Sequence, residues 1–384
     1  MIFTIVCDVL GRENNGTTVA AMNLIRYLKK QGHEVRVVCP DQEKEGLEGY
    51  YIMPKLNAGP LNSYVDKVGV TISLVDREKL ADALRGADAV HIMTPFMLSC
   101  AAVHMAKEMG LPVTAGFHCQ AENITSHLFL MNSPTANHIT YKELWKHFYQ
   151  YVDAIHYPTQ FIRDVFEQEI GRTTNGYVIS NGVGSRFAHQ ETEKPEAFRD
   201  RFVILFTGRY GKEKSHRRLI DGAALSRHAP DIQLIFAGKG PLEKEIEAHA
   251  AEKLAHLPLM KFFSREEMLQ VINYADLYVH PAEVEIEAIA CLEAISCGLV
   301  PVIADSPRCA TRHFALDERN LFRYDDPADL AEKIDYWIEH PQEKELCSRR
   351  YMGYTRQFEQ EHCMELMEQM MLETRARILS QKNH

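Results

Sequence analysis

The chain has 384 residues, of which 46% are hydrophobic and 25% are charged. At roughly 150 residues per domain, this length predicts two to three domains with enough apolar material for two cores. The composition excludes a disordered, collagen-like or membrane-spanning class. The 43 basic and 53 acidic residues give a formal net charge of −10. Such a balance argues against a dedicated nucleic-acid binder, because neutralising phosphates requires a basic surface.

The cysteines and the amino terminus bear on the compartment. Nine cysteines are scattered along the chain, and none forms a C-x-x-C pair. They indicate neither a disulfide framework nor a zinc cage, and they favour a reducing compartment. The apolar amino terminus has no basic lead-in and meets Asp8 at once, and no later stretch has the about 18 apolar residues of a membrane span. We therefore expect neither a signal peptide nor a transmembrane helix.

The first half of the chain alternates strands and helices. Residues 2–7 form a β-prone run without polar alternation, which is typical of a parallel strand buried on both faces. A turn rich in glycine and asparagine runs from Gly11 to Gly16, and Thr17 is placed to cap a helix that stops at Gly32. Further strands are expected at 34–39, 89–93 and 113–117. This order predicts a Rossmann-like domain.

The same order of elements restarts after the polar stretch 188–200, which we interpret as a linker. Strands are expected at 202–206, 233–237, 276–279 and 300–303, with a helix at 218–225. The predicted fold class is therefore α/β, with two Rossmann-like domains, 1–187 and 201–360, facing each other across a cleft. A helical tail, 361–384, is expected to pack back on the first domain. In such sheets, ligands bind at the carboxyl ends of the strands.

Four glutamates, at 283, 285, 287 and 293, lie around a predicted helix start at Ala288. On a helical path Glu285 and Glu293 would lie about 12 Å apart, a length that suits an extended two-part ligand. The helix amino terminus between them would offer backbone N–H groups to a phosphate. We assign Glu283 and Glu287 to a charged solvent face, whereas the apolar neighbours of Glu293 weaken that interpretation there.

The segment resembles the signature of retaining glycosyltransferases with the GT-B fold, in which seven residues separate two glutamates. The likeness extends to other segments of the chain: a diphosphate loop at 208–214, a second glycine turn at 238–241, an interdomain motif at 180–183, Gly16 and His118. The run 283–303, together with 306–317, resembles bacterial synthases that transfer glucose from UDP-glucose to diacylglycerol. Where the family often has glycines after the first glutamate, this chain has Ile286 and Ala288.

The resemblance implies roles for these residues. Glu285 would hold sugar hydroxyls, Glu293 the ribose and His118 the sugar near the reacting carbon. Arg209 and Lys214 would offset the charge that builds on the leaving diphosphate. The implied donor site is completed by Gly16, Gly238, Ala288 and Ile289. We assign the neighbouring Lys212, Arg217 and Arg218 to the surface. No D-x-D pair stands where a metal would bridge the diphosphate, so we expect metal-independent transfer with no cofactor besides the UDP-glucose donor.

A lipid acceptor predicts a membrane-facing surface on the first domain, which binds the acceptor in this fold. An aromatic stripe follows helical spacing there, with a basic residue alongside: Tyr141, Leu144, Trp145, Lys146, Phe148 and Tyr151. The apolar run 128–131 is a second candidate for the same surface. The alternative is that the stripe packs on its own sheet. Attraction to anionic lipid would come from such a patch, at about 1 kcal/mol per basic residue.

These observations favour an enzyme that transfers glucose from UDP-glucose to diacylglycerol, giving α-monoglucosyldiacylglycerol. Its expected place is the cytoplasm, peripherally associated with the inner face of the cell membrane, with no nucleic-acid partner. Three alternatives remain open. The acceptor could be phosphatidylinositol or a soluble sugar, the chain could be a UDP-sugar epimerase with the same two-domain fold, or it could be a non-catalytic binding protein.

Overall fold

The computed structural model describes residues 1–10, 16–55 and 73–382, so the expected turn residues 11–15 lie outside the described part. The chain divides into two compact units, Met1–Asn181 with Glu361–His384, and Gly182–Gln360. The segment 182–200, which we had expected to belong to the first domain and a linker, clusters with the second unit. Val183 forms a parallel bridge with Glu359, and the Lys194 ammonium lies 2.6 Å from the Asp276 carboxylate. These contacts attach both ends of the segment to the second unit.

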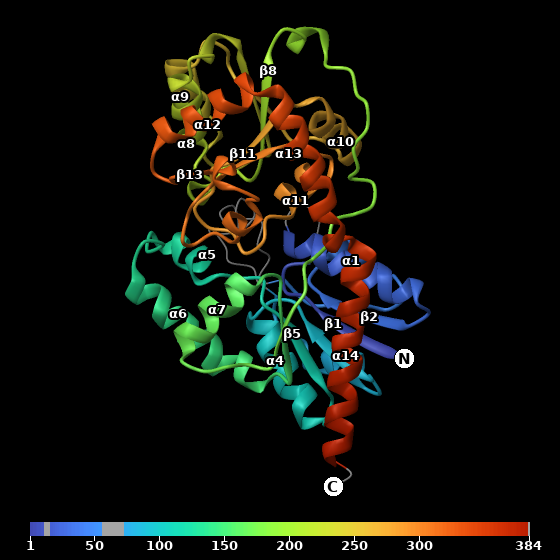
Figure 1. The fold of residues 1–384 in the computed structure, drawn as a ribbon. Helices are drawn as coiled ribbons and strands as arrows, with labels where there is room; N and C mark the ends of the chain where they lie inside the picture. Colours follow the sequence, from blue (N-terminus) through green and yellow to red (C-terminus); the bar gives the residue numbers. More distant parts are fainter. Residues whose placement is uncertain (11–15, 56–72, 383–384) are drawn as a thin grey trace. The chain divides into compact units, whose positions relative to one another are not determined.

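In its described residues, the first unit contains one parallel sheet of seven strands in the order β3-β2-β1-β4-β5-β6-β7 (Figure 1). The strands are β1 (Ile2–Val6), β2 (Glu34–Cys39), β3 (Tyr50–Ile52), β4 (Ala89–Ile92), β5 (Val113–Gly116), β6 (Ala154–Tyr157) and β7 (Gly176–Val178). The apolar runs expected as strands at 2–7, 34–39, 89–93 and 113–117 are confirmed. Because the strands are parallel, their carboxyl ends share one edge of the sheet.

Helices follow most of these strands, as the βαβ pattern requires. They are α1 (Gly16–Lys30), α3 (Arg77–Leu84), α4 (Met97–Glu108), α5 (Ala121–Thr125), α6 (Pro134–His147) and α7 (Gln160–Ile170). The helix α1 ends before Gly32, whose φ of 81° is in the left-handed region that terminates helices. The expected stop at Gly32 is therefore confirmed.

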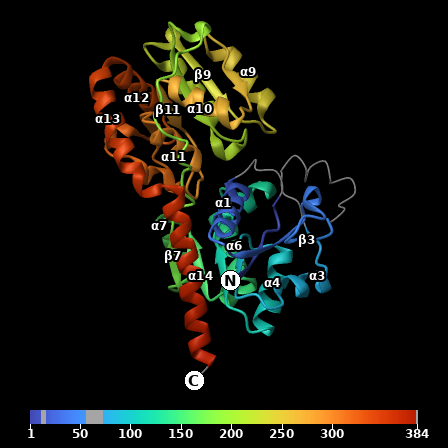
Figure 2. The ribbon, with the colours of Figure 1, turned by 90° about the vertical axis from the view of Figure 1, so that its right-hand side faces the viewer.

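The carboxyl-terminal helix α14 (Gln360–Lys382) runs along the first unit (Figure 2). Its buried face is rich in methionine and joins the core formed by α1, β1 and β2. Polar contacts along the helix also attach it to the first unit. The Glu373 carboxylate accepts a hydrogen bond from Tyr177, and the Arg375 guanidinium lies 2.7 Å from the Asp88 carboxylate.

The second unit contains a parallel sheet of six strands, β10-β9-β8-β11-β12-β13, among its described residues. The strands are β8 (Phe202–Thr207), β9 (Ile232–Ala237), β10 (Leu259–Lys261), β11 (Leu277–His280), β12 (Pro301–Ala304) and β13 (Leu321–Phe322). The helices are α8 (His216–Leu225), α9 (Glu243–Lys253), α10 (Arg265–Tyr274), α11 (Ile289–Ser296), α12 (Pro327–Glu339) and α13 (Pro341–Tyr354).

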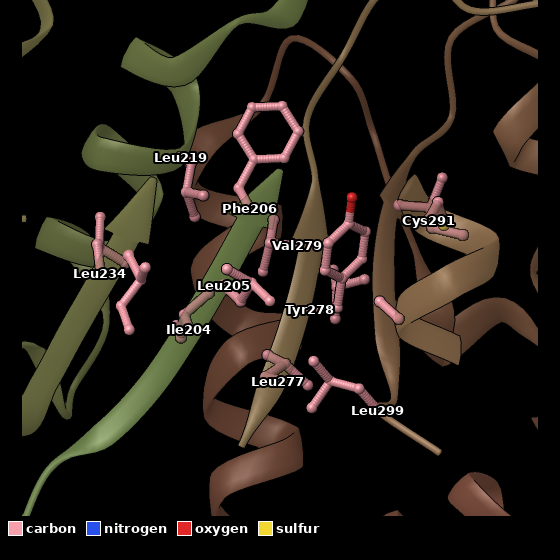
Figure 3. Packing of buried hydrophobic residues seen from close by; sticks show 14 of the residues in the cluster. Ile204, Leu205, Phe206, Leu219, Leu234, Leu277, Tyr278, Val279, Cys291 and Leu299 are labelled. Carbon is pink, nitrogen blue, oxygen red and sulfur yellow. The ribbon is translucent and has the colours of Figure 1, made fainter. Parts of the chain in front are cut away.

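The middle strands of this sheet are apolar along their length because helices cover both faces. Figure 3 shows Leu205 and Phe206 of β8 beside Tyr278 and Val279 of β11, all fully buried. A packed core of this kind holds the strand ends rigidly. The loops that leave those ends therefore start from fixed positions.

Candidate active site

The loop after β8 is held by two glycines of the turn that follows β9. A Cβ atom on Gly238 would lie 2.0 Å from the carbonyl oxygen of Gly208, and one on Gly240 would lie 2.7 Å from the backbone nitrogen of Tyr210. Only glycine permits so close an approach of two backbones. The two glycine turns therefore pack against each other and fix the loop that carries Arg209, which is half-buried.

Lys214 and Glu285 form an ion pair at the carboxyl edge of the second sheet. Lys214 ends the short 3-10 turn Lys212–Lys214, and Glu285 lies in the loop after β11. His280, the last residue of β11, places its Nε2 atom 3.5 Å from Oε1 of the same carboxylate. All three side chains are largely buried. The structure thus brings together a cation, a carboxylate and an imidazole from two loops and a strand.

The charges of this trio are set by their mutual contacts. Burial alone would raise the pKa of Glu285, but the Lys214 ammonium and the His280 ring outweigh it, and the pKa falls to about 2. Burial disfavours the charge on Lys214, yet Glu285 and Glu213 raise its pKa. Burial lowers the pKa of His280 against the opposing effect of Glu285. At neutral pH the site therefore holds an ionised carboxylate, an ammonium and a neutral imidazole.

A second carboxylate anchors the loop that carries Glu285. The Glu283 carboxylate accepts hydrogen bonds from Arg218 and Arg308, each at 3.0 Å. Its backbone N–H donates to the Glu213 carbonyl at 2.8 Å, beside Lys214. The expectation of a solvent-facing Glu283 and a surface Arg218 is wrong, because each neutralises the other within the fold. Sequence reasoning missed this clamp, since its two arginines come from different elements.

The helix after this loop starts later than the sequence pattern suggested. Helix α11 begins at Ile289, and Ala288 precedes it in the left-handed region with φ of 61°. Glu285 therefore lies outside the helix, in a bridge with Cys309, and its separation from Glu293 is not set by helical rise. The assignment of Glu287 to solvent is also wrong, because its side chain is only 4% exposed.

Glu293 lies within α11, in the same unit as the trio. Burial raises the pKa of its carboxyl to about 7, although Arg186 and Arg265 act in the opposite direction. Glu293 therefore changes charge near neutral pH, in contrast to Glu285.

The remaining predicted residues lie in the first unit. His118 follows β5 and folds over Gly116, where a Cβ atom would lie 2.4 Å from the histidine Nε2. Its ring meets the His156 ring edge-on at 5.4 Å, and burial lowers its pKa well below the ordinary value, so the ring is neutral at pH 7. Gly16 is the exposed first residue of α1. The neighbouring residues 11–15 are outside the described part.

The aromatic stripe on α6 packs inward. Tyr141 and Phe148 are each 1% exposed, and the Tyr141 hydroxyl donates a hydrogen bond to Glu122 at 3.1 Å. The expectation that these two aromatics face a membrane is therefore wrong, because they fill the space between α6 and the sheet. Leu144 and Trp145 are half-buried, while Lys146 is exposed.

The described residues lack two kinds of feature. They contain no group of three or more histidine, cysteine, aspartate or glutamate side chains arranged to hold a metal ion. None of their helices combines the length and apolar character needed to span a bilayer.

Two family models match the chain one after the other. Residues 14–185 match Glycosyltransferase Family 4, and residues 188–353 match Glycosyl transferases group 1. Together the matches span both structural units. The chain belongs to the glycosyltransferases of the GT-B fold.

Individual relatives are distant across the full chain. The GDP-mannose-dependent alpha-mannosyltransferase of Corynebacterium glutamicum is 23% identical over 92% of this chain and 84% of its own. The alpha-monoglucosyldiacylglycerol synthase of Acholeplasma laidlawii is 22% identical over 75% and 76%. Anabaena HepE, solved in complex with UDP and glucose, has a TM-score of 0.74 at 15% identity, covering 96% of this chain and 99% of its own. The catalytic domain of cholesterol-alpha-glucosyltransferase from Helicobacter pylori is 48% identical, with a TM-score of 0.39, over 40% of this chain and 96% of its own.

Proposed function

We propose that this glycosyltransferase moves glucose from UDP-glucose to the free hydroxyl of diacylglycerol, with retention of the anomeric configuration. The observation that carries the proposal is the contact between Lys214 and Glu285. In a sugar nucleotide the diphosphate and the sugar are adjacent, and this pair offers an ammonium for the first beside a carboxylate for the second. Arg209 would bind the diphosphate as well.

The chemistry follows from these charges. Breaking the bond between the sugar and the diphosphate builds negative charge on the leaving oxygen, so a fixed cation lowers the barrier. Lys214 supplies that cation without having to gain a proton, because its pKa is raised. Glu285, with a pKa of about 2, stays ionised and accepts hydrogen bonds from sugar hydroxyls. The backbone N–H groups at the start of α11, after Ala288, add a further seat for phosphate.

The other residues take roles at the two ends of the donor. Glu293 would accept hydrogen bonds from the ribose hydroxyls, and Gly238 would keep the diphosphate loop in place. The neutral ring of His118 would contact the transferred sugar and donate or accept one hydrogen bond. Retention is supported by the alpha-linked product in the name of the Acholeplasma laidlawii relative, since glucose is α-linked in UDP-glucose.

The names of several relatives support a lipid acceptor. Two relatives are alpha-monoglucosyldiacylglycerol synthases, and another is a mannosyltransferase that acts on a phosphatidylinositol dimannoside. We therefore place the enzyme peripherally at the inner face of the cell membrane. Lys214 and Glu285 would bind the donor in the same way whichever lipid is the acceptor.

A second candidate has the same chemistry with another donor. Relatives that use GDP-mannose match this chain at an identity similar to that of the glucosyltransferases, and over a larger share of the chain. The two candidates differ in the sugar of the donor, glucose or mannose, and in its base, uracil or guanine. Lys214 and Glu285 would serve either donor in the same way.

The test offers radiolabelled UDP-glucose or GDP-mannose to the purified protein with diacylglycerol, phosphatidylinositol or cholesterol in mixed micelles. Label from UDP-glucose in the organic phase with diacylglycerol is the expected result. Transfer only from GDP-mannose, or only to another acceptor, would contradict the proposed substrates. Isomerised UDP-sugar formed without acceptor would indicate an epimerase. Lys214→Ala and Glu285→Gln are the matched variants, and transfer that survives both unchanged would contradict the site.

A further inference from the structure

The connection between α5 and α6 presents three consecutive large apolar side chains to solvent. Leu128, Phe129 and Leu130 are 66%, 85% and 44% exposed. We call residues 128–130 the apolar tip. In Figure 1 the connection between α5 and α6 lies at the outer edge of the first unit. Three adjacent exposed side chains of this size form a patch, whereas a single one would be ordinary.

Hydrogen bonds hold the backbone of the tip in place. The N–H of Leu130 donates to the Thr125 carbonyl at 2.9 Å, and that of Phe129 donates to the Ser126 carbonyl at 3.1 Å. The Asn137 side chain reaches from α6, where its amide accepts a hydrogen bond from the Thr125 hydroxyl at 2.6 Å. These hydrogen bonds hold the backbone of the tip in the turn that exposes its side chains.

Phe129 also adopts an unfavourable backbone conformation. Its φ of 59° and ψ of 23° lie in the left-handed region, which residues with a Cβ atom rarely adopt. Among the described residues, the other non-glycine positions with positive φ are Ser215, which follows Lys214, and Ala288, which belongs to the proposed donor site. Strain of this kind persists where the surrounding structure imposes it, and it concentrates at functional segments.

We propose that the apolar tip inserts into the interfacial region of a lipid bilayer. This inference rests on the proposed function, which places the acceptor in a membrane. A bilayer fits the shape of the feature, because consecutive apolar residues on a turn form a protrusion rather than the broad face or groove that a protein helix needs. The exposed residues of α6 include Ile139, Lys142 and Lys146; the Lys142 ammonium donates a hydrogen bond to the Ile170 carbonyl at 3.1 Å, and the Lys146 ammonium lies 3.9 Å from the Glu143 carboxylate.

The tip lies close in the chain to the candidate active-site histidine. β5 ends at Gly116, His118 follows, and α5 begins at Ala121, so one short segment carries both the candidate active-site histidine and the tip. Insertion of the tip would hold the membrane surface near His118. The hydroxyl of a lipid acceptor must arrive at that end of the segment. The membrane contact of α6 expected from Tyr141 and Phe148 is replaced by this one.

The experiment uses the full chain with Phe129→Gly. Glycine removes the apolar ring and also relieves the positive φ, so the variant is expected to fold at least as well as the wild type. The matched control is Leu225→Ser, which removes another side chain with 60% exposure, at the end of α8. Binding is measured by sedimentation with vesicles of phosphatidylethanolamine and phosphatidylglycerol, at low and high salt.

We expect Phe129→Gly to weaken vesicle binding at least about tenfold at both salt concentrations, because the contact is mainly apolar. Leu225→Ser should bind like the wild type, and both variants should keep the affinity for UDP. Unchanged vesicle binding by Phe129→Gly would overturn the inference. A change of oligomeric state on gel filtration, with vesicle binding unaltered, would also overturn it, because the tip would then join two copies of the chain.

Transfer assays separate this inference from the proposed function. If the wild type transfers glucose to diacylglycerol but Phe129→Gly binds vesicles normally, the function stands and the tip is wrong. If vesicle binding depends on Phe129 but diacylglycerol receives no sugar, the tip stands and the acceptor is wrong. Diacylglycerol dispersed in detergent should restore transfer by Phe129→Gly, since the catalytic groups are unaltered.

Discussion

Replacing Lys214 by methionine tests the ion pair on which the proposed site depends. Methionine keeps most of the length and apolar stem of lysine but removes its charge. The Glu285 carboxylate would then be buried without its ammonium partner, while the His280 ring would stay near it. Removing one partner of a buried pair is more harmful than removing both, because a lone buried charge is left.

The magnitude follows from the pKa of Glu285. Its fall from 4.5 to about 2 corresponds to about 3 kcal/mol of stability, at about 1.4 kcal/mol for each pH unit. Because the folded-state pKa is depressed, this stability is present above pH 4.5 and is lost as the pH falls through 2. For a unit the size of the second one, the loss corresponds to a fall in melting temperature of roughly 6–12 °C at pH 7.

The assay is thermal denaturation of Lys214→Met and of the double variant with Glu285→Gln. The single variant should melt at the lower temperature at pH 7. Its difference from the wild type should shrink as the pH falls from about 4.5 towards 2, because the Glu285 carboxyl is protonated first in the unfolded chain and then in the folded wild type. The double variant should recover most of the loss. A single variant that melts within about 2 °C of the wild type at pH 7, with Glu285 unmutated, would refute the coupling inferred for the pair.

The remaining predictions concern Glu293 and the backbone of the donor site. Because the pKa of Glu293 is about 7, calorimetry should show UDP affinity rising between about pH 6 and pH 8, and Glu293→Gln should abolish the rise; an unchanged pH profile would contradict the ribose assignment. Ala288→Gly, at φ of 61°, should raise the melting temperature by about 2–4 °C, and a lower one would show that the position is unstrained. Gly238→Ala brings a Cβ atom within 2.0 Å of the Gly208 carbonyl and should weaken UDP binding at least about tenfold, whereas Gly353→Ala, with no atom within 4 Å, should bind normally.

The apolar runs of the chain predicted its parallel strands and the sheet edge at which the following loops meet. Apolar runs such as 202–206 and 276–279 are long enough to be buried on both faces, so they predict parallel strands without knowledge of their partners. Polar residues directly after such strands must then meet at one edge of the sheet. The resemblance to the GT-B glycosyltransferases assigned Lys214 and Glu285, which are 71 residues apart in the chain, to one site, and the structure places their side chains in contact.

Other features of the site depend on contacts between segments that no local pattern records. Spacing identified the stripe on α6 as one face of a helix, but only the packing of Phe117 and Phe166 against Tyr141 decided that this face points inward. The clamp on Glu283 likewise needs two arginines supplied by different elements.

The sequence by itself therefore determined the class of the chain, the two parallel sheets and the loops that carry the charges of the proposed donor site. These properties depend on the periodicity of apolar residues and on the direction of parallel strands, which are local or follow from chain order. Only the tertiary structure decided that Glu285 precedes its helix, that Glu283 and Glu287 are withdrawn from solvent, and that the three consecutive apolar side chains at 128–130 are exposed. Burial and ion pairing depend on which distant segments pack together. The free energy of those contacts therefore cannot be assigned to any single segment.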